Sequence, residues 1–191
     1  MRNTPIPDSY WLVPGRLLAG EYPGAKTKDE ARRKLRAFLE AGVTIFLDLT
    51  EETEGLEAYA PLLHGEAEKR NLRVAHRRLA IPDLGLPTIG LMREIQRVIV
   101  SELEAGQTVY VHCWGGIGRT GTAIGCYLVG QELSGAEALA EIRRLRRGTP
   151  NGWRKSPETQ AQEDFVKSWL QFVAEDRLQS NGEDSAKAAR R

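Results

Sequence analysis

Residues 109–121 read VYVHCWGGIGRTG, and this stretch decides the fold that we predict. A run of β-forming residues ends at His112, Cys113 follows at once, and Arg119 opens an apolar segment with helical spacing. Three glycines lie between Cys113 and Arg119. This pattern is typical of a buried strand, a tight turn and a helix in succession.

A turn of this kind can bind an anion. Its glycines let successive backbone N–H groups point inward, and the helix that follows adds the positive end of its dipole. The guanidinium of Arg119 matches two oxygens of a phosphate or a sulfate. The same positive field would stabilise the thiolate of Cys113. The alternative is a structural turn with a buried cysteine, but such a turn needs neither the arginine nor three glycines.

Strand-like and helix-like segments alternate around this loop. Spacing and end signals predict strands over 43–50, 72–81 and 108–112, and helices over 28–42, 56–70, 88–105, 119–133, 135–147 and 157–177. This alternation predicts a single α/β domain with a central, mostly parallel sheet flanked by helices. The loop at 113–118 then lies at the carboxyl ends of the strands, where open α/β sheets bind ligands.

Length and composition fit one globular domain: the chain has 191 residues, of which 41% are apolar and 28% charged. We predict a folded domain over residues 1–178 and a polar, disordered tail over 179–191. A net charge of +1 gives no reason to expect a nucleic-acid partner, and no apolar run is long enough for membrane insertion. Two cysteines cannot form a disulfide framework, so we expect a cytoplasmic protein.

The motif His112-Cys113-x5-Arg119-Thr120 resembles the active-site motif of the cysteine-dependent protein tyrosine phosphatases, including their dual-specificity branch. The flanks are most similar to the compact bacterial and dual-specificity-like members. The resemblance covers residues 8–175, and the match is specific over 109–125. It implies that the folded domain is a phosphatase catalytic domain with a phosphate loop between a strand and a helix. The implied reaction is phosphomonoester hydrolysis through a phosphocysteine intermediate, without cofactor or metal.

The resemblance also implies roles for individual residues. Cys113 would be the nucleophile, and Thr120 would steady its thiolate and ease its departure. His112 would support Cys113 through hydrogen bonds, although a purely structural role for this histidine stays open. The phosphate would be bound by Arg119 together with the loop residues Trp114, Gly115, Gly116, Ile117 and Gly118.

A general acid should protonate the leaving oxygen. Related enzymes carry this acid on a separate loop about thirty residues before the cysteine, and Asp83 in LAIPDLGLPTIG stands at that separation from Cys113. We predict Asp83 as the acid, with a turn cap as the alternative role for this residue. Asp48 is the rival acid, because its strand should end at the same edge of the sheet.

Three further features have open interpretations. SPETQAQEDFV is similar to the segment that positions the hydrolytic water in tyrosine-specific members, with Gln162 in the functional place or simply on the helix surface. Glu158 departs from that pattern, because another glutamine is usual there. Cys126 lies in an apolar helix and is expected to be a core thiol rather than a partner for oxidised Cys113. The acidic residues Glu51, Glu52 and Glu54 are interpreted as a solvated loop, not a metal site.

The expected substrate is a phosphotyrosine or phosphoserine/phosphothreonine protein, or a small phosphomonoester, and the expected oligomeric state is a monomer. Basic pairs at Arg77–Arg78 and Arg154–Lys155 would also suit an inositol phosphate or a phosphoinositide, but the loop lacks the lysines of lipid phosphatases. A non-catalytic module that binds phosphoproteins is a second alternative. A sulfurtransferase or an arsenate reductase is a third, since these enzymes also hold an oxyanion or a persulfide in a cysteine loop.

Overall fold

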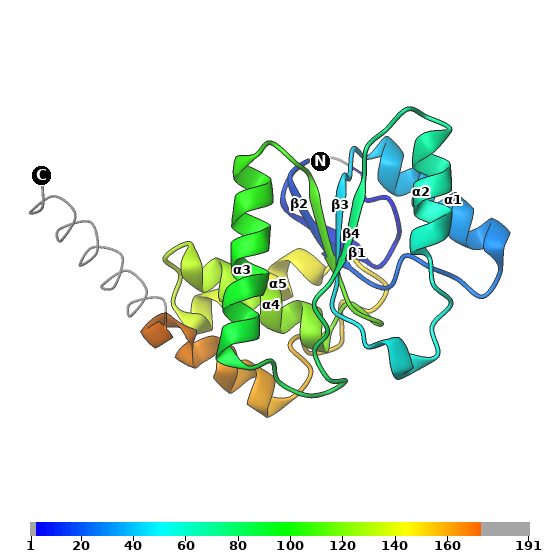
Figure 1. Cartoon of the computed structure of the whole chain (residues 1–191). Helices are drawn as coiled ribbons and strands as arrows, with labels where there is room; N and C mark the ends of the chain where they lie inside the picture. Colours follow the sequence, from blue (N-terminus) through cyan, green and yellow to red (C-terminus); the bar gives the residue numbers. More distant parts are fainter. Residues whose placement is uncertain (1–2, 173–191) are drawn as a thin grey trace, which may run out of the picture.

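The computed structural model describes residues 3–172, which form a five-stranded sheet between two layers of helices (Figure 1). The strands lie in the order β1-β2-β5-β3-β4. β1 is antiparallel to β2, and every other neighbouring pair is parallel. Their bounds are β1 Ser9–Val13, β2 Leu17–Gly20, β3 Ile45–Asp48, β4 Ala75–Arg78 and β5 Val109–His112. The predicted single α/β domain with a mostly parallel sheet is confirmed, and the predicted tail over 179–191 lies outside the described residues.

The helices cover both faces of the sheet (Figure 1). α1 (Lys28–Glu40) and α2 (Ala60–Glu68) pack on one face. The opposite face is covered by α3 (Ile89–Glu104), α4 (Gly118–Gly130), α5 (Gly135–Arg146) and a last helix that begins at residue 160 and continues to 172, the end of the described range. A short 3-10 helix, η1 (Glu52–Glu54), follows β3.

β5 lies in the middle of the sheet and is buried on both faces. Because side chains alternate along a strand, Val109 and Val111 join the core beneath α3 and α4, whereas Tyr110 packs against Phe38 of α1. Burial of each large apolar side chain contributes about 1.5–3 kcal/mol, so this central strand is strongly fixed. A strand buried on both faces explains why the sequence before Cys113 is apolar without alternation.

Several predicted elements are shorter than expected, α2 and β4 most clearly. α2 begins at Ala60 and not at residue 56, because Pro61 has no N–H and is accommodated only in the first turn of a helix. β4 covers Ala75–Arg78 and not 72–81, and it lies at the edge of the sheet. The start of α3 is as predicted, since the side chain of Thr88 accepts a hydrogen bond from the N–H of Leu91.

The register of the sheet brings the ends of three strands together. Gly20 at the end of β2 and Asp48 at the end of β3 both pair with His112 at the end of β5. The segments that follow these strands therefore leave the sheet at one edge, next to the loop that contains Cys113. This edge is where a parallel sheet presents its ligand site.

Candidate active site

The phosphate loop, residues 113–118, connects β5 to α4, and its backbone is closely packed. Gly116 has φ = +67°, and a Cβ at this position would stand 2.3 Å from the carbonyl carbon of Gly20. Only glycine fits there. The carbonyl oxygen of Trp114 accepts a hydrogen bond of 2.8 Å from the N–H of Tyr22, which ties the loop to the segment after β2. α4 begins at Gly118, so the loop ends at a helix N-terminus suited to an anion.

A pocket of about 460 Å³ lies over this loop. It is lined by Cys113, Arg119 and Asp83, so the structure brings three of the four predicted catalytic residues together; the fourth, Thr120, is not part of this lining. Cys113 is buried and is a free thiol. The rest of the lining comes from Glu21, Leu84, Trp114, Gly115, Ile117, Gly118, Arg154 and Glu158.

The guanidinium of Arg119 is held between two carboxylates, and its side chain is only 2% exposed. Both of its terminal nitrogens donate to Glu54, with Nη2 2.9 Å from Oε2. Nη2 also lies 3.0 Å from Oδ1 of Asp83, and Nη1 donates to the carbonyl oxygen of Ile81 at 3.2 Å. Burial opposes the charge, but the hydrogen bonds from Arg119 to Glu54 and the negative charge around it raise the pKa of Arg119. The pocket therefore contains a fixed cation.

Glu54 is a site residue that the sequence analysis missed. Besides Arg119, its carboxylate accepts a hydrogen bond of 2.6 Å from the N–H of Glu51. Burial opposes ionisation of Glu54, but the bonds from Arg119 and Glu51 outweigh it and lower the pKa of this carboxyl group. The only sequence signal is the Glu51-x-x-Glu54 spacing, which matches the capping box that the structure shows at η1.

The interpretation of the acidic cluster as a solvated loop is wrong for Glu54. Glu54 contacts Arg119, and the side chain of Glu51 accepts a hydrogen bond of 3.2 Å from the N–H of Asp83. Glu52 is solvated, with 84% of its side chain exposed.

The two candidate acids differ sharply in their surroundings. Asp83 has 53% of its side chain exposed and lines the pocket. Asp48 is fully buried, and its oxygens accept hydrogen bonds from Thr50, His76 and Arg78 at 2.6 to 3.1 Å. Burial opposes the ionised form of Asp48, but these bonds prevail and lower its pKa. Asp48 is therefore a buried structural carboxylate, and its place rules it out as the acid.

His112 lies beneath Cys113 and is fully buried. Its Nε2 is 2.7 Å from the hydroxyl oxygen of Tyr59, and its Nδ1 is 3.3 Å from the carbonyl oxygen of Cys113. Burial lowers the pKa of His112 to about 4, so the imidazole is neutral at physiological pH. The tautomer that satisfies both contacts donates from Nδ1 to Cys113 and accepts from Tyr59 at Nε2. This geometry fits the supporting role predicted for His112, and Tyr59 is a partner that the sequence did not indicate.

Thr120 and Gln162 are both fully buried. The Thr120 hydroxyl has no hydrogen-bond partner within residues 3–172, so its contact with the thiolate stays a prediction. The alternative that Gln162 simply lies on the helix surface is wrong, because this side chain is fully buried. Its Oε1 accepts from the N–H groups of Glu158 and Thr159, and its Nε2 donates to the carbonyl oxygen of Gly85.

Other side chains singled out in the sequence lie away from the pocket. Cys126 is fully buried within α4, and burial raises the pKa of its thiol, which confirms a core cysteine. Of the two basic pairs, only Arg154 lines the pocket; Arg77 pairs with Glu102, Arg78 with Asp48 and Lys155 with Glu163. Within residues 3–172, no group of histidine, cysteine and acidic side chains is arranged to hold a metal, and no helix has the length and apolar character to cross a bilayer.

The sequence and the fold are similar to those of known phosphatases. The family model described as "Swiss Army Knife protein, DSP-PTPase phosphatase domain" matches residues 7–166. The dual specificity protein phosphatase CDC14AB of Danio rerio is 31% identical over 150 residues, which are 74% of this chain but only 22% of that protein. The cyclin-dependent kinase inhibitor 3 of Rattus norvegicus is 27% identical over 75% of this chain and 72% of its own length. The chain thus spans about a fifth of the zebrafish relative.

Solved structures show the same fold. Tk-PTP in its active form is 30% identical, with a TM-score of 0.63 over 86% of this chain and 97% of that chain. The kinase associated phosphatase is 21% identical, with a TM-score of 0.66 over 83% of this chain and 87% of that chain, and supports the fold alone. With the family model matching most of the described residues, the chain belongs to the cysteine-dependent protein tyrosine phosphatase superfamily, as a compact dual-specificity-like member.

Proposed function

We propose that this protein hydrolyses phosphomonoesters on protein side chains through a phosphocysteine intermediate. The observation that carries the proposal is that one pocket of about 460 Å³ is lined by a thiol, a fixed guanidinium and an exposed carboxyl group, those of Cys113, Arg119 and Asp83. A nucleophile, an oxyanion-binding cation and a proton donor are the three components that this chemistry requires.

In the first step, the Cys113 sulfur attacks the phosphorus atom while the bond from phosphorus to the leaving oxygen breaks. Asp83 transfers its proton to that oxygen. Arg119 and the N–H groups of the phosphate loop hold the non-bridging oxygens, whose charge the helix N-terminus also stabilises. In the second step, water attacks phosphocysteine and gives its proton to Asp83, and the sulfur–phosphorus bond breaks to release phosphate and the thiolate.

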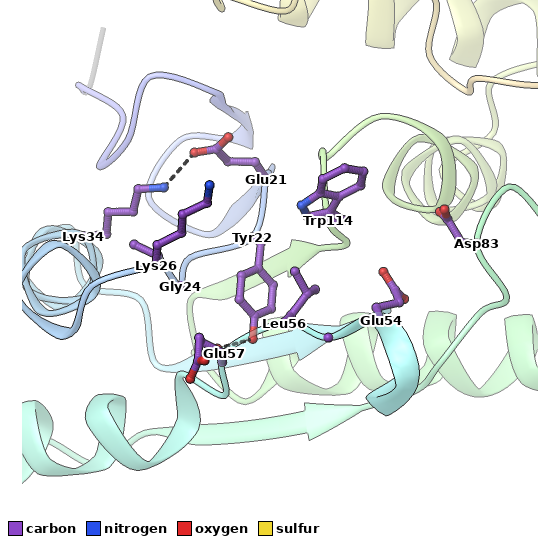
Figure 2. Close-up of a pocket in the computed structure, with 12 residues that line it drawn as sticks. Glu21, Tyr22, Gly24, Lys26, Lys34, Glu54, Leu56, Glu57, Asp83 and Trp114 are labelled. Atoms are coloured by element: carbon purple, nitrogen blue, oxygen red, sulfur yellow. Dashed lines mark hydrogen bonds and ion pairs between the residues drawn. The ribbon is translucent and has the colours of Figure 1, made fainter.

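A second cavity of about 610 Å³ adjoins the first, since Glu21, Asp83 and Trp114 line both (Figure 2). It offers room for the residues beside a phosphorylated side chain, and Trp114, 62% exposed, stands at the boundary. Its charged lining consists of Glu21, Glu54, Glu57 and Asp83 against Lys26 and Lys34. Since Glu54 and Asp83 pair with Arg119 and Glu21 pairs with Lys34, this lining has no excess of positive charge to attract a multiply phosphorylated inositol, and we favour a phosphopeptide.

The test is hydrolysis of p-nitrophenyl phosphate, with a chelator present, by the full chain and two variants. Cys113→Ser should abolish turnover and still bind inorganic phosphate, because the loop and Arg119 survive. Cys126→Ser is the matched control, a second buried cysteine outside the pocket, and should stay active. Turnover by Cys113→Ser would refute the mechanism, and phosphopeptide binding without any turnover by the unmodified chain would favour a binding module.

Peptides with phosphotyrosine, phosphoserine or phosphothreonine, compared with an inositol polyphosphate, would then define the substrate class. A cytoplasmic location belongs to the proposal, since a reactive thiol needs a reducing compartment to stay reduced.

A further inference from the structure

The loop that carries Asp83 buries little apolar surface. Between the buried residues Ile81 and Pro87, the side chains of Leu84 and Leu86 are 57% and 41% exposed. Leu84 has φ = +55°, a conformation that a leucine rarely adopts. A segment with so little buried apolar surface needs other contacts to keep one position.

Besides the ion pair between Asp83 and Arg119, two hydrogen bonds from distant residues hold this loop, one on either side of Leu84. The N–H of Asp83 donates to the side chain of Glu51, and the carbonyl oxygen of Gly85 accepts from Nε2 of Gln162 at 3.1 Å. Gln162 is 77 residues from Gly85 in sequence and comes from the last helix.

Gln162 is itself rigidly placed. Its Oε1 accepts from the backbone N–H groups of Glu158 at 3.1 Å and Thr159 at 3.2 Å, and the backbone N–H of Gln162 donates to the Thr159 hydroxyl. These contacts permit only one orientation of the amide, with the oxygen toward the helix start and the nitrogen toward Gly85. The same amide packs on the phosphate loop, since a Cβ on Gly118 would lie 3.0 Å from Oε1.

We propose that Gln162 is a positioning residue for the general acid: it fixes the distance between the acid loop and the phosphate loop, so that Asp83 faces the leaving oxygen. The proposal rests on the proposed phosphatase function. It replaces the water-positioning role implied by the resemblance, because the acceptor oxygen of Gln162 already binds two N–H groups. Glu158, and not Gln162, lines the catalytic pocket.

Gln162→Glu isolates the contact with the acid loop. In its ionised form the new carboxylate still accepts from Glu158 and Thr159 at the helix start, but it cannot donate to Gly85. Gln160→Glu is the matched control, with the same chemical change on the exposed side of the same helix. Should Gln162→Glu fail to fold, Gln162→Met removes the donor with an uncharged side chain of similar length.

The measurement is kcat/KM for phenyl phosphate, a poor leaving group, and for p-nitrophenyl phosphate, a good one. A general acid contributes 10²–10⁴-fold, so we expect Gln162→Glu to lose about tenfold or more on phenyl phosphate and less than about twofold on p-nitrophenyl phosphate. In an Asp83→Asn background the same change should have no further effect on either substrate. Equal losses on both substrates would contradict the proposal and indicate a purely structural role for Gln162. A fall in kcat with unchanged kcat/KM would also contradict it and would indicate that Gln162 positions the hydrolytic water.

Hydrogen exchange of the peptide that contains Gly85 tests the contact without reference to activity. Exchange should be faster in Gln162→Glu than in the unmodified protein and unchanged in Gln160→Glu. Unchanged exchange in Gln162→Glu would overturn the proposal even if the phosphatase activity is established. Faster exchange in a protein without Cys113-dependent turnover would instead show that the contact is real and the proposed function wrong.

Discussion

Glu54→Gln tests whether a carboxylate must hold the phosphate-binding arginine. Glutamine keeps the shape of the side chain, but it removes the charge and turns an N–H donor toward the guanidinium of Arg119. Arg119 is only 2% exposed, so water replaces the missing acceptor poorly. The carboxylate of Asp83, 3.0 Å from Nη2, is then the remaining anionic partner among the contacts described for this side chain.

The expected magnitude follows from the lost hydrogen bond. Hydrogen bonds to charged groups contribute about 1.5–3 kcal/mol, and 1.36 kcal/mol corresponds to a tenfold change in rate. If Arg119 must keep its present orientation in the transition state, Glu54→Gln should lower kcat/KM by about 10- to 150-fold. The loss of stability should remain below the roughly 3–5 kcal/mol of a fully broken buried ion pair, because Asp83 stays in place.

The assay is kcat/KM for p-nitrophenyl phosphate, with the free energy of unfolding measured in urea alongside it. Glu52→Gln makes the same change in the same 3-10 helix on a side chain that is 84% exposed. Its ion pair with Arg78 is a surface contact and should contribute little, so activity should stay within about twofold. A loss in Glu54→Gln no larger than the loss in Glu52→Gln would refute the reasoning.

Three further predictions concern the packing around the loop. Gly116→Ala should lower the melting temperature by several degrees, because the added Cβ would clash with the backbone of Gly20. Gly115→Ala should leave the melting temperature unchanged, because the Cβ added there would contact only the side chain of Ile117, at 3.7 Å. Tyr59→Phe leaves Nε2 of His112 without a donor and should lower the free energy of unfolding, measured in urea, by about 1–3 kcal/mol. An unchanged free energy of unfolding would contradict the hydrogen bond between Tyr59 and His112. The pKa of His112 is about 4 in the folded protein, below its value of about 6.5 in the unfolded chain. As the pH is lowered, the unfolded chain therefore binds the proton first. The free energy of unfolding should fall by up to about 3 kcal/mol as the pH decreases from 6.5 to about 4. His112→Asn should flatten that urea-denaturation profile, and an unchanged slope would contradict the assignment.

Local pattern was enough to predict β5, the glycine turn and α4, the elements that form the phosphate loop. The glycines at 115, 116 and 118 and the apolar strand before Cys113 are neighbours in sequence, so their geometry follows from short-range rules. The parallel sheet follows from the alternation of strands and helices. Boundaries were less certain, and only the position of Pro61 explains where α2 begins.

The partners of the site residues could not be predicted in the same way. Glu54 reaches Arg119 across 65 positions, and Tyr59 reaches His112 across 53. No spacing rule connects such residues, because their meeting depends on how the segment after β3 leaves the sheet beside β5 and α4. A charged residue on a loop is usually solvated, so a buried ion pair there is visible only in the folded structure.

The positions of the site's side chains therefore depend on the register of β5. This strand pairs with β2 and β3 at once, with Gly20 and Asp48 both opposite His112. A slip of one residue would turn His112 and every other side chain of β5 to the opposite face of the sheet. Cys113 would then lose its support, and Tyr110 would be placed in the core that now contains Val109 and Val111. Because the two faces contain different side chains, the hydrophobic core that stabilises the fold also keeps the nucleophile in place.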